Sequence, residues 1–406
     1  MHAKDPSGPW SEPVWVDQGG IDPSLFFDDD GTVYYCSNAT VEGKMGIALS
    51  IIDPITGERL SPIEHICSGS GGRYPEGPHL NKINDWYYLM IAEGGTEYVH
   101  METIFRSRSP WGPYEGCPHN LILSHRDYTN SPIQCTGHAD MVEDQNGNWW
   151  LLCLGVRPLK SMLHNLGRET FLAPVTWTSD GWPVIGNDGY IKMEMNGPLP
   201  EDIFPQSDTW LDHFESNTLD LNWNFIRNPK MENYDLSSSK GAIKIIGESK
   251  TLSEDKESPS FIGKRQQHFN CTAEVNMSIN ADDQNFEAGI TAYYNDSYHY
   301  EEFLTKIDGE YYVCLRKKVH DIEVITDKKK VNFKEEIIFR IRCDRDYYYF
   351  DYKLPEEDWG NLGKGMTAGL CNEGTHTMTF TGTFLGMYCV NGNAFFDWFK
   401  YTGCND

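Results

Sequence analysis

The fold is decided by three stretches built on one plan: residues 19–38, GGIDPSLFFDDDGTVYYCSN; residues 74–95, YPEGPHLNKINDWYYLMIAEGG; and residues 135–155, CTGHADMVEDQNGNWWLLCLG. In each stretch, small residues lead to a polar or ionisable residue, a short apolar run, a turn and an aromatic run. The turns are hairpin signals between runs of strand-forming residues: Asp30-Gly31, Asn84-Asp85 and Asn146-Gly147. The first half of the chain is therefore predicted to be a series of β-hairpins.

The repeats recur at a spacing of 54 and then 62 residues, which suits four-stranded propeller blades with generous loops. The innermost strand of each blade lines the central channel, so equivalent positions lie around one axis. We expect Asp22, Glu76 and His138 to occupy that equivalent position. Apolar neighbours imply that the three groups are partly buried, which indicates a functional site. Taken singly, each could equally cap a strand or hold a turn.

Composition restricts the class of protein. A chain of 406 residues suits two domains, and its Trp 12, Tyr 22 and Phe 19 favour β structure. A formal net charge of -26 argues against nucleic acid and anionic membranes as partners, because those surfaces need clustered Lys and Arg. Neutral sugars are easier to accommodate. The 11 cysteines include no CxxC pair, which argues against a zinc site.

Targeting signals are absent from the sequence as it stands. No stretch approaches the roughly 20 apolar residues that a membrane-spanning helix needs. The opening residues, MHAKDPSGPW, contain no apolar signal segment, which slightly favours a cytoplasmic location over secretion and leaves the localisation open.

A second repeat concerns the beginning of the chain. The stretch DPSGPWSEP at 5–13 matches SRSPWGPYE at 107–115, where a blade closes after its fourth strand. We therefore expect the chain to open on the tail of a blade and to hold about three and a half blades, fewer than the 4–8 of closed propellers. An N-terminal portion would then lie outside this chain or come from another one. Exposed strand edges would favour a homo-oligomer or a complementing N-terminal chain.

The composition changes at PLPEDIFPQSD, residues 198–208, which places a boundary near residue 205 and predicts domains at 1–204 and 205–406. Beyond the boundary, alternating strand-like segments are separated by polar turns. These are FNCTAEVNMSI (269–279), AGITAYYND (288–296), YYVCLRKK (311–318), IIFRIRCD (337–344) and FFDWFKY (395–401). The pattern predicts an antiparallel β-sandwich.

The motifs resemble glycoside hydrolase family 43, in particular its β-xylosidase and α-L-arabinofuranosidase branch. The matching segments are IDPSLFFDDDG, EGPHL followed by WYYLMIAEGGT, TGHADMVE, and LGRETFLAPVTW with DGWPV. The stretch SPSFIGKRQQHFNCTAEV resembles the C-terminal domain of the xylosidase branch. The resemblance implies an all-β protein: a five-bladed β-propeller, N-terminally incomplete in this chain, followed by a concanavalin-A-like β-sandwich.

The resemblance also implies inversion of the anomeric centre and three acidic residues. Glu76 in EGPH matches the general acid, and Asp22 in IDPS matches the aspartate that orients the acid and adjusts its pKa. The competing assignment makes Asp22 the base, but Ile21 before it and LFFDDDG after it fit the orienting role better. The general base is then absent from this chain. An inverting enzyme needs that carboxylate roughly 6.5–9.5 Å from the acid.

Three further residues are implied for substrate binding. His138 in TGHAD matches a histidine near the channel axis that can contact a hydrated calcium ion, and a satisfied core histidine is the equal alternative. Arg168 in LGRET matches an arginine that donates to sugar hydroxyls, and the alternative is that Arg168 forms a salt bridge to the neighbouring Glu169. Phe380 lies in NEGTHTMTFTG, the segment nominated to close over the pocket, although filling the sandwich core is the slightly favoured reading. No cofactor is required, and a structural calcium at the axis is compatible.

We therefore expect an exo-acting hydrolase that releases xylose or arabinofuranose from xylo-oligosaccharides or arabinoxylan-derived oligosaccharides. The alternative is a non-catalytic carbohydrate-binding protein, because the base is missing. A WD-type interaction scaffold is disfavoured by the ionisable residues facing the channel. Among the tryptophans, Trp149 and Trp150 are more typical of blade packing, whereas Trp86 or Trp111 could stack on a sugar.

Overall fold

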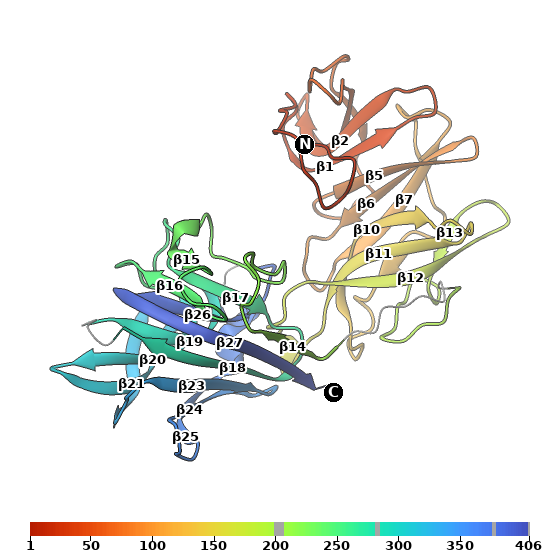
Figure 1. Ribbon diagram of the computed structural model, residues 1–406. Coiled ribbons are helices and arrows are strands. Elements are labelled where there is room, and N and C mark those ends of the chain that lie inside the picture. The colour runs from red at the N-terminus through yellow and green to blue at the C-terminus, as the bar shows by residue number, and fades with distance from the viewer. Residues whose placement is uncertain (199–206, 281–284, 376–378, 405–406) are drawn as a thin grey trace. The chain divides into compact units, whose positions relative to one another are not determined.

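The computed structural model describes residues 1–198, 207–280, 285–375 and 379–404, and these are almost entirely strands and turns (Figure 1). They form two compact units, Met1–Arg157 with Glu169–Glu201, and Pro158–Arg168 with Asp202–Asp406. The predicted boundary near residue 205 lies outside the described residues. Residues 158–168 were expected in the first domain, whereas the structure places them in the second unit, to which their backbone is hydrogen-bonded.

The first unit consists of three antiparallel β-propeller blades (Figure 1). The first blade has the strand order β1 (Ile21–Phe27), β2 (Val33–Val41), β3 (Lys44–Ile51) and β4 (Glu64–Cys67). The second has β5 (Glu76–Ile83), β6 (Trp86–Glu93), β7 (Met101–Ser107) and β8 (Glu115–Gly116), with β9 (Leu123–Ser124) also paired to β7. The third has β10 (Gln134–Glu143), β11 (Trp149–Val156), β12 (Glu169–Trp177) and β13 (Pro183–Ile185).

Each blade opens with the hairpin predicted from its turn residues. Gly31, Asn84 and Gly147 have φ values of 86°, 55° and 81°, the left-handed conformation that glycine and asparagine tolerate best. The three predicted hairpins are thus confirmed. The predicted repeat of residues 107–115 at the start of the chain is also present. The N–H of Gly8 bonds to the carbonyl of Asp5, just as the N–H of Gly112 bonds to the carbonyl of Ser109.

Neighbouring blades are joined by alternating faces of the same strand. On β6, Leu89 and Ile91 are fully buried in a cluster with Ile47 and Leu49 of the first blade. Met90, between them, points the other way into a cluster with side chains of the third blade. This period of two is the side-chain alternation of a strand, so β6 supplies apolar contacts to both neighbours.

The second unit is a β-sandwich of an eight-stranded and a six-stranded antiparallel sheet (Figure 1). The larger sheet has the order β15 (Tyr234–Asp235), β16 (Ile243–Gly247), β27 (Gly392–Cys404), β18 (Asn270–Ile279), β23 (Glu336–Cys343), β24 (Tyr347–Lys353) and β25 (Gly360–Met366), with β14 (Thr209–Asp212) paired to β27. The smaller has β17 (Phe261–Arg265), β26 (Phe384–Val390), β19 (Glu287–Asn295), β20 (Tyr298–Ile307), β21 (Glu310–Val319) and β22 (Ile322–Val331). The predicted sandwich is therefore confirmed, and its core includes the fully buried Phe339, Phe350 and Phe396.

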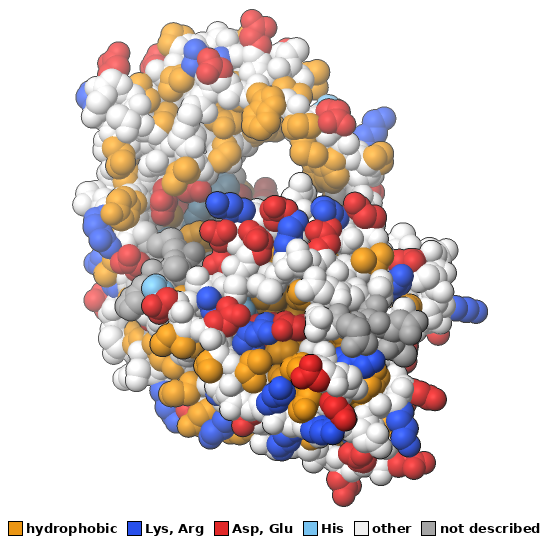
Figure 2. Space-filling view, turned by 90° about the vertical axis from the view of Figure 1, so that its left-hand side faces the viewer, with side chains coloured by type: hydrophobic (Ala, Val, Ile, Leu, Met, Phe, Trp, Pro, Cys, Tyr) orange, Lys and Arg blue, Asp and Glu red, His pale blue; other side chains and the backbone are white. Residues whose placement is uncertain are grey.

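Helical structure is limited to one α-turn and three 3-10 turns among the described residues. These are α1 (Asn372–Thr375), η1 (Lys160–Met162), η2 (Met231–Asn233) and η3 (Thr367–Leu370). No helix in this part of the chain has the length and hydropathy to cross a bilayer. All 11 cysteines are described and none is disulfide-bonded. Acidic and basic side chains are interspersed over the face of the sandwich shown in Figure 2.

Candidate active site

A one-residue β-bulge near the start of each blade's first strand builds the candidate site. The pairing register shifts by one residue between Ile21 and Ser24, between Glu76 and His79, and between Gly137 and Asp140. Bulges re-aim side chains and often lie next to active sites. The bulges make Asp22, Gly77 and His138 equivalent, with left-handed φ values of 52°, 59° and 48°.

The expectation that Asp22, Glu76 and His138 share one position is therefore wrong by one residue. Glu76 precedes the left-handed position and is equivalent to Ile21 and Gly137. Because a one-residue shift in a strand turns a side chain to the other face, Glu76 leaves its strand in a different direction from Asp22 and His138. The structure nevertheless brings the three residues together around Gly77.

Asp22 is attached to the backbone that carries Glu76. Its Oδ2 accepts a hydrogen bond from the N–H of Gly77 at 3.2 Å. Two more bonds join the same blades, from the Ser24 hydroxyl to the carbonyl of Pro78 at 2.5 Å and from the Asn38 amide to the carbonyl of Pro75. The peptide of Glu76 is thus held to the first blade on both sides, while its side chain is partly exposed.

His138 packs against the other side of the same glycine. A Cβ atom built on Gly77 would lie 2.8 Å from both Cδ2 and Nε2 of the His138 ring, so only glycine leaves room for the imidazole. The ring itself is partly exposed and not enclosed in a core. Asp22 and His138 therefore flank the residue that follows Glu76.

A buried carboxyl group supports the bulge that presents His138. Glu102 on β7 has no exposed surface, and its Oε2 accepts the N–H of Ala139 at 3.0 Å. The backbone N–H of His138 also donates a hydrogen bond to this carboxyl group. Burial raises the pKa of Glu102 well above its ordinary value, which favours the protonated acid. Its Oε1 is buried and lacks a hydrogen-bond partner among the described residues.

A second buried glutamate fixes the loop that leads into β5. The carboxylate of Glu93 accepts the N–H of Ser70 at 2.8 Å and the N–H of Gly72 at 2.7 Å. The hydroxyl of Thr103 also donates to it, at 2.8 Å. Glu93 therefore holds the loop that leads to Glu76, and Glu102 holds the bulge that carries His138.

The second unit brings together Arg168 and Phe380. The guanidinium carbon of Arg168 lies 3.9 Å from the centre of the Phe380 ring, and the Arg168 N–H bonds to the carbonyl of Phe380 at 2.8 Å. Phe380 is 41% exposed, so the slightly favoured expectation that it fills the sandwich core is wrong. Glu169, the alternative partner expected for Arg168, forms an ion pair with Arg157, with Nη2 and Oε1 at 2.8 Å.

Residues 158–168 are fastened to the sandwich by several independent contacts. Arg265 on β17 donates through Nη2 to the carbonyls of Leu166, at 2.8 Å, and of Arg168. The His164 ring pairs with Glu373 at 2.7 Å. These contacts explain why a segment inserted between two propeller strands belongs to the second unit and carries Arg168 with it.

The close backbone approach at this junction depends on glycine. A Cβ on Gly167 would lie 2.4 Å from the amide nitrogen of Gly382, and a Cβ on Gly382 would lie 2.3 Å from the carbonyl carbon of Leu166. Both glycines have left-handed φ values, 74° and 71°. Any side chain at either position would push the Arg168 segment away from Phe380.

Side chains that could bind calcium directly are not grouped at His138 in the described part of the chain, so a hydrated calcium contacted through water stays a prediction. Among the described residues, no three or more His, Cys, Asp or Glu side chains are grouped so that they could hold a metal ion. Calcium takes 6–8 oxygen ligands, and a single imidazole does not supply them.

The sequence motifs identified Asp22, Glu76, His138, Arg168 and Phe380 but missed the residues that position them. Gly77 was visible as the glycine of EGPH, and Arg265 as the arginine of IGKRQQ. Glu102, in an apolar strand with one acidic residue, carried no local signal of its role.

Comparisons with known proteins match both halves of the chain. Residues 1–183 match the family model described as Glycosyl hydrolases family 43, and residues 211–402 match that of the Beta xylosidase C-terminal Concanavalin A-like domain. The chain is 40% identical to the "Non-reducing end alpha-L-arabinofuranosidase BoGH43B" of Bacteroides ovatus, over 98% of this chain and 75% of that protein. It is 32% identical to "Xylosidase/arabinosidase 43B" of Humicola insolens, over 97% of this chain and 77% of that protein.

Solved structures show the same relationship. The structure "Bacteroides ovatus Xyloglucan PUL GH43B" superposes with a TM-score of 0.92 at 40% identity, covering 99% of this chain and 79% of that one. The xylan beta-1,4-xylosidase from Bacillus halodurans C-125 superposes with a TM-score of 0.91 at 30% identity, covering 98% of this chain and 80% of that one. On this similarity and on the site described above, the chain belongs to glycosyl hydrolase family 43 and is a glycosidase.

Proposed function

We propose that this glycosidase is an inverting, exo-acting enzyme that releases xylose or arabinofuranose from xylo-oligosaccharides or arabinoxylan-derived oligosaccharides. The observation that carries the proposal is the bond from the Gly77 N–H to Asp22, which couples a second carboxylate to the backbone of Glu76. A nearby carboxylate disfavours ionisation of a general acid, and the acid must be protonated when substrate binds.

Glu76 acts as the general acid. Its proton passes to the glycosidic oxygen as the bond from that oxygen to the anomeric carbon breaks, and the leaving chain departs as a neutral alcohol. Asp22 accepts the Gly77 N–H and so holds the acid's peptide, and we assign to it the pKa-adjusting role that the family resemblance implies. A water molecule attacks the opposite face of the sugar and gives its proton to a general base, a role that we assign to no residue of this chain.

Arg168 recognises the terminal sugar. A guanidinium presents donors in a planar fork, which suits two adjacent hydroxyls as well as a carboxylate. The centre of the Phe380 ring lies 3.9 Å from the guanidinium carbon, a cation–π contact that favours this position of the fork. His138, whose ring lies beside Gly77 in the first unit, is the other residue proposed to bind the sugar.

The choice of pentose rests on the relatives. The names printed for them include a non-reducing end α-L-arabinofuranosidase, a xylosidase/arabinosidase and a "Xylan 1,3-beta-xylosidase". All three names describe removal of pentoses, and the first specifies a chain end. Pentose release by exo-action is therefore the activity that these relatives support best for this chain.

The proposal is tested with the 4-nitrophenyl β-xyloside and α-L-arabinofuranoside. We expect release of 4-nitrophenol from at least one of them, and proton NMR of the β-xyloside reaction should show α-xylose as the first product. First appearance of β-xylose would contradict inversion. Binding of xylo-oligosaccharides with no hydrolysis of either glycoside would favour the alternative, a non-catalytic carbohydrate-binding protein.

A further inference from the structure

A separate pocket lies at the other end of the blade strands. Its volume is about 520 Å³, within the range of ligand-binding pockets, and its lining includes Tyr88, Trp149, Trp177, Glu143, Asn84 and Ser179. Strand β5 runs from Glu76 to Ile83, and β10 runs from Gln134 past His138 to Glu143. The pocket is at the far end of both strands, roughly 20 Å from the bulges at 3.3 Å per residue. We call it the Trp177 pocket.

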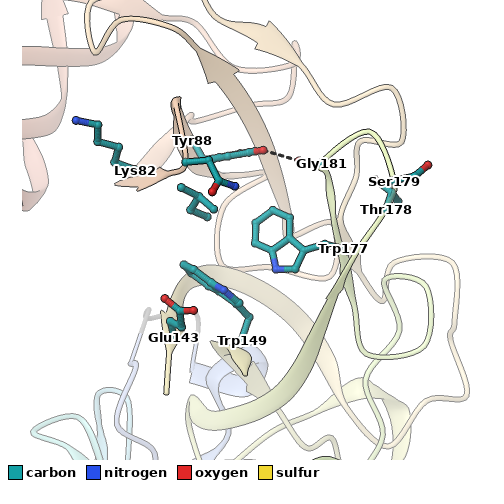
Figure 3. Close-up of a pocket in the computed structure, with 10 residues that line it drawn as sticks. Lys82, Tyr88, Glu143, Trp149, Trp177, Thr178, Ser179 and Gly181 are labelled. Atoms are coloured by element: carbon teal, nitrogen blue, oxygen red, sulfur yellow. Dashed lines mark hydrogen bonds between the residues drawn. The ribbon is translucent and has the colours of Figure 1, made fainter. Parts of the chain in front are cut away.

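Two indole rings form a corner in the Trp177 pocket. The rings of Trp149 and Trp177 are 5.5 Å apart at an interplanar angle of 84°, and Tyr88 lies 5.6 Å from Trp177. Figure 3 shows the Trp177 ring projecting into the space between Tyr88 and Trp149. The Tyr88 hydroxyl donates to the carbonyl of Gly181, which fixes the turn that follows Trp177. Trp149 was expected to be more typical of blade packing, and it does pack against a buried core cluster of the blades. It is also partly exposed and lines this pocket, whereas Trp150 is buried.

These indole faces differ from those of the neighbouring tryptophans. Trp86 is covered by the guanidinium groups of Arg106 and Arg108, at 4.4 Å and 3.7 Å from the ring centre. Among the described residues, no cation lies over Trp149 or Trp177. Trp86, expected as a sugar platform, is thus occupied, while the rings of the Trp177 pocket keep surface that a ligand can contact.

The polar groups around the rings favour a neutral ligand with hydroxyl groups. Glu143 is exposed and forms no salt bridge within the described part of the chain, so its carboxylate is available as an acceptor. Lys82, the basic residue of the lining, is held by Asp28 at 2.7 Å and Asp29 at 2.9 Å. An anionic ligand would meet uncompensated negative charge, whereas a sugar offers C–H faces to the indoles and hydroxyls to Glu143 and Asn84.

We propose that the Trp177 pocket is a second carbohydrate-binding site, which holds a neutral oligosaccharide on the enzyme away from the hydrolytic site. Such a site raises the local concentration of polysaccharide at the bulge end of the blades. The proposal does not depend on the roles of Glu76 and Asp22, because it concerns binding at the opposite strand ends.

The test follows one indole signal during a titration with xylohexaose. The protein carries 15N-tryptophan and the Glu76→Gln substitution, which should slow hydrolysis of the ligand about 10²–10⁴-fold, and the Trp177 signal is identified by its loss in Trp177→Phe. We expect this signal to shift saturably. Ser179→Arg places bulk and charge at the pocket's mouth and should raise the dissociation constant read from that signal by about tenfold or more. Ser179 is exposed, so this variant does not disturb the blade core.

The exposed Trp15, at 86% exposure, provides the matched control signal and should not move. An unchanged Trp177 signal up to roughly 10 mM xylohexaose would overturn the proposal. So would an equal dissociation constant in Ser179→Arg, or tighter binding of an oligogalacturonate. Failure of the hydrolytic proposal would appear instead in the glycoside assays, which this titration does not use.

Discussion

The buried carboxyl of Glu102 makes the stability of the first unit depend on pH in an unusual direction. In the folded protein burial raises its pKa, so the proton is retained, whereas an unfolded chain releases it above an ordinary pKa of about 4.3. Protons bound by the folded state exceed those bound by the unfolded state over this interval. The free energy of unfolding therefore falls as pH rises, by up to about 1.4 kcal/mol per pH unit for one group, until the folded-state pKa is reached.

Replacing Glu102 with Gln removes this dependence with little change of shape. The amide oxygen of Gln can accept the Ala139 N–H that Oε2 accepts at 3.0 Å in the parent protein. The stability of the variant relative to the parent should therefore improve with pH above about pH 5, by up to about 1.4 kcal/mol per pH unit until the folded-state pKa of Glu102 is reached.

Hydrogen exchange of peptides from residues 134–156, measured across urea concentration at each pH, reports the first unit by itself. Glu143→Gln is the matched control, because Glu143 is an exposed carboxyl on the same strand. Parallel pH profiles for the parent and Glu102→Gln would show that Glu102 is ionised in the folded protein and would refute the reasoning.

Two more substitutions test the supports of the site. Gly77→Ala places a methyl group 2.8 Å from the His138 ring at a φ of 59°. We expect the free energy of unfolding to fall by about 1–2 kcal/mol in thermal unfolding, together with a fall in kcat on 4-nitrophenyl glycosides. Gly147→Ala lies at a left-handed turn with open surroundings and controls for backbone strain, so an equal loss of activity in that variant would contradict the steric argument. Arg265→Met removes the hydrogen bonds to the carbonyls of Leu166 and Arg168, each worth about 1.5–3 kcal/mol. We expect KM to rise about tenfold or more with a smaller change in kcat, and Arg265→Lys to restore KM in part. Equal KM values for the parent and both variants would contradict the anchoring role of Arg265.

The sequence predicted what depends on local signals. Turn pairs such as Asn84-Asp85 fixed the hairpins, and alternating apolar residues fixed the strands of the sandwich, because these features are decided within a few residues. The motif residues Asp22 and Glu76 were recognised for the same reason, since each lies in a short stretch of recognisable order.

The features that the sequence did not reveal depend on contacts between distant segments. The one-residue offset of Glu76 arises from a bulge, which inserts a residue without a compositional signal. The transfer of residues 158–168 to the second unit depends on partners such as Arg265 and Glu373, far away in the chain. For the same reason Phe380 was read as core, although the guanidinium of Arg168 covers its ring.

The central claim is that Glu76 protonates the leaving group, and its most direct test compares two leaving groups in Glu76→Gln. Xylobiose departs as a poor leaving alcohol and needs the acid, so its turnover should fall about 10²–10⁴-fold. The 2,4-dinitrophenyl β-xyloside departs as a stable phenolate, and its turnover should fall far less. Equal losses on both substrates, or unchanged turnover of xylobiose, would contradict the assignment of Glu76 as the general acid.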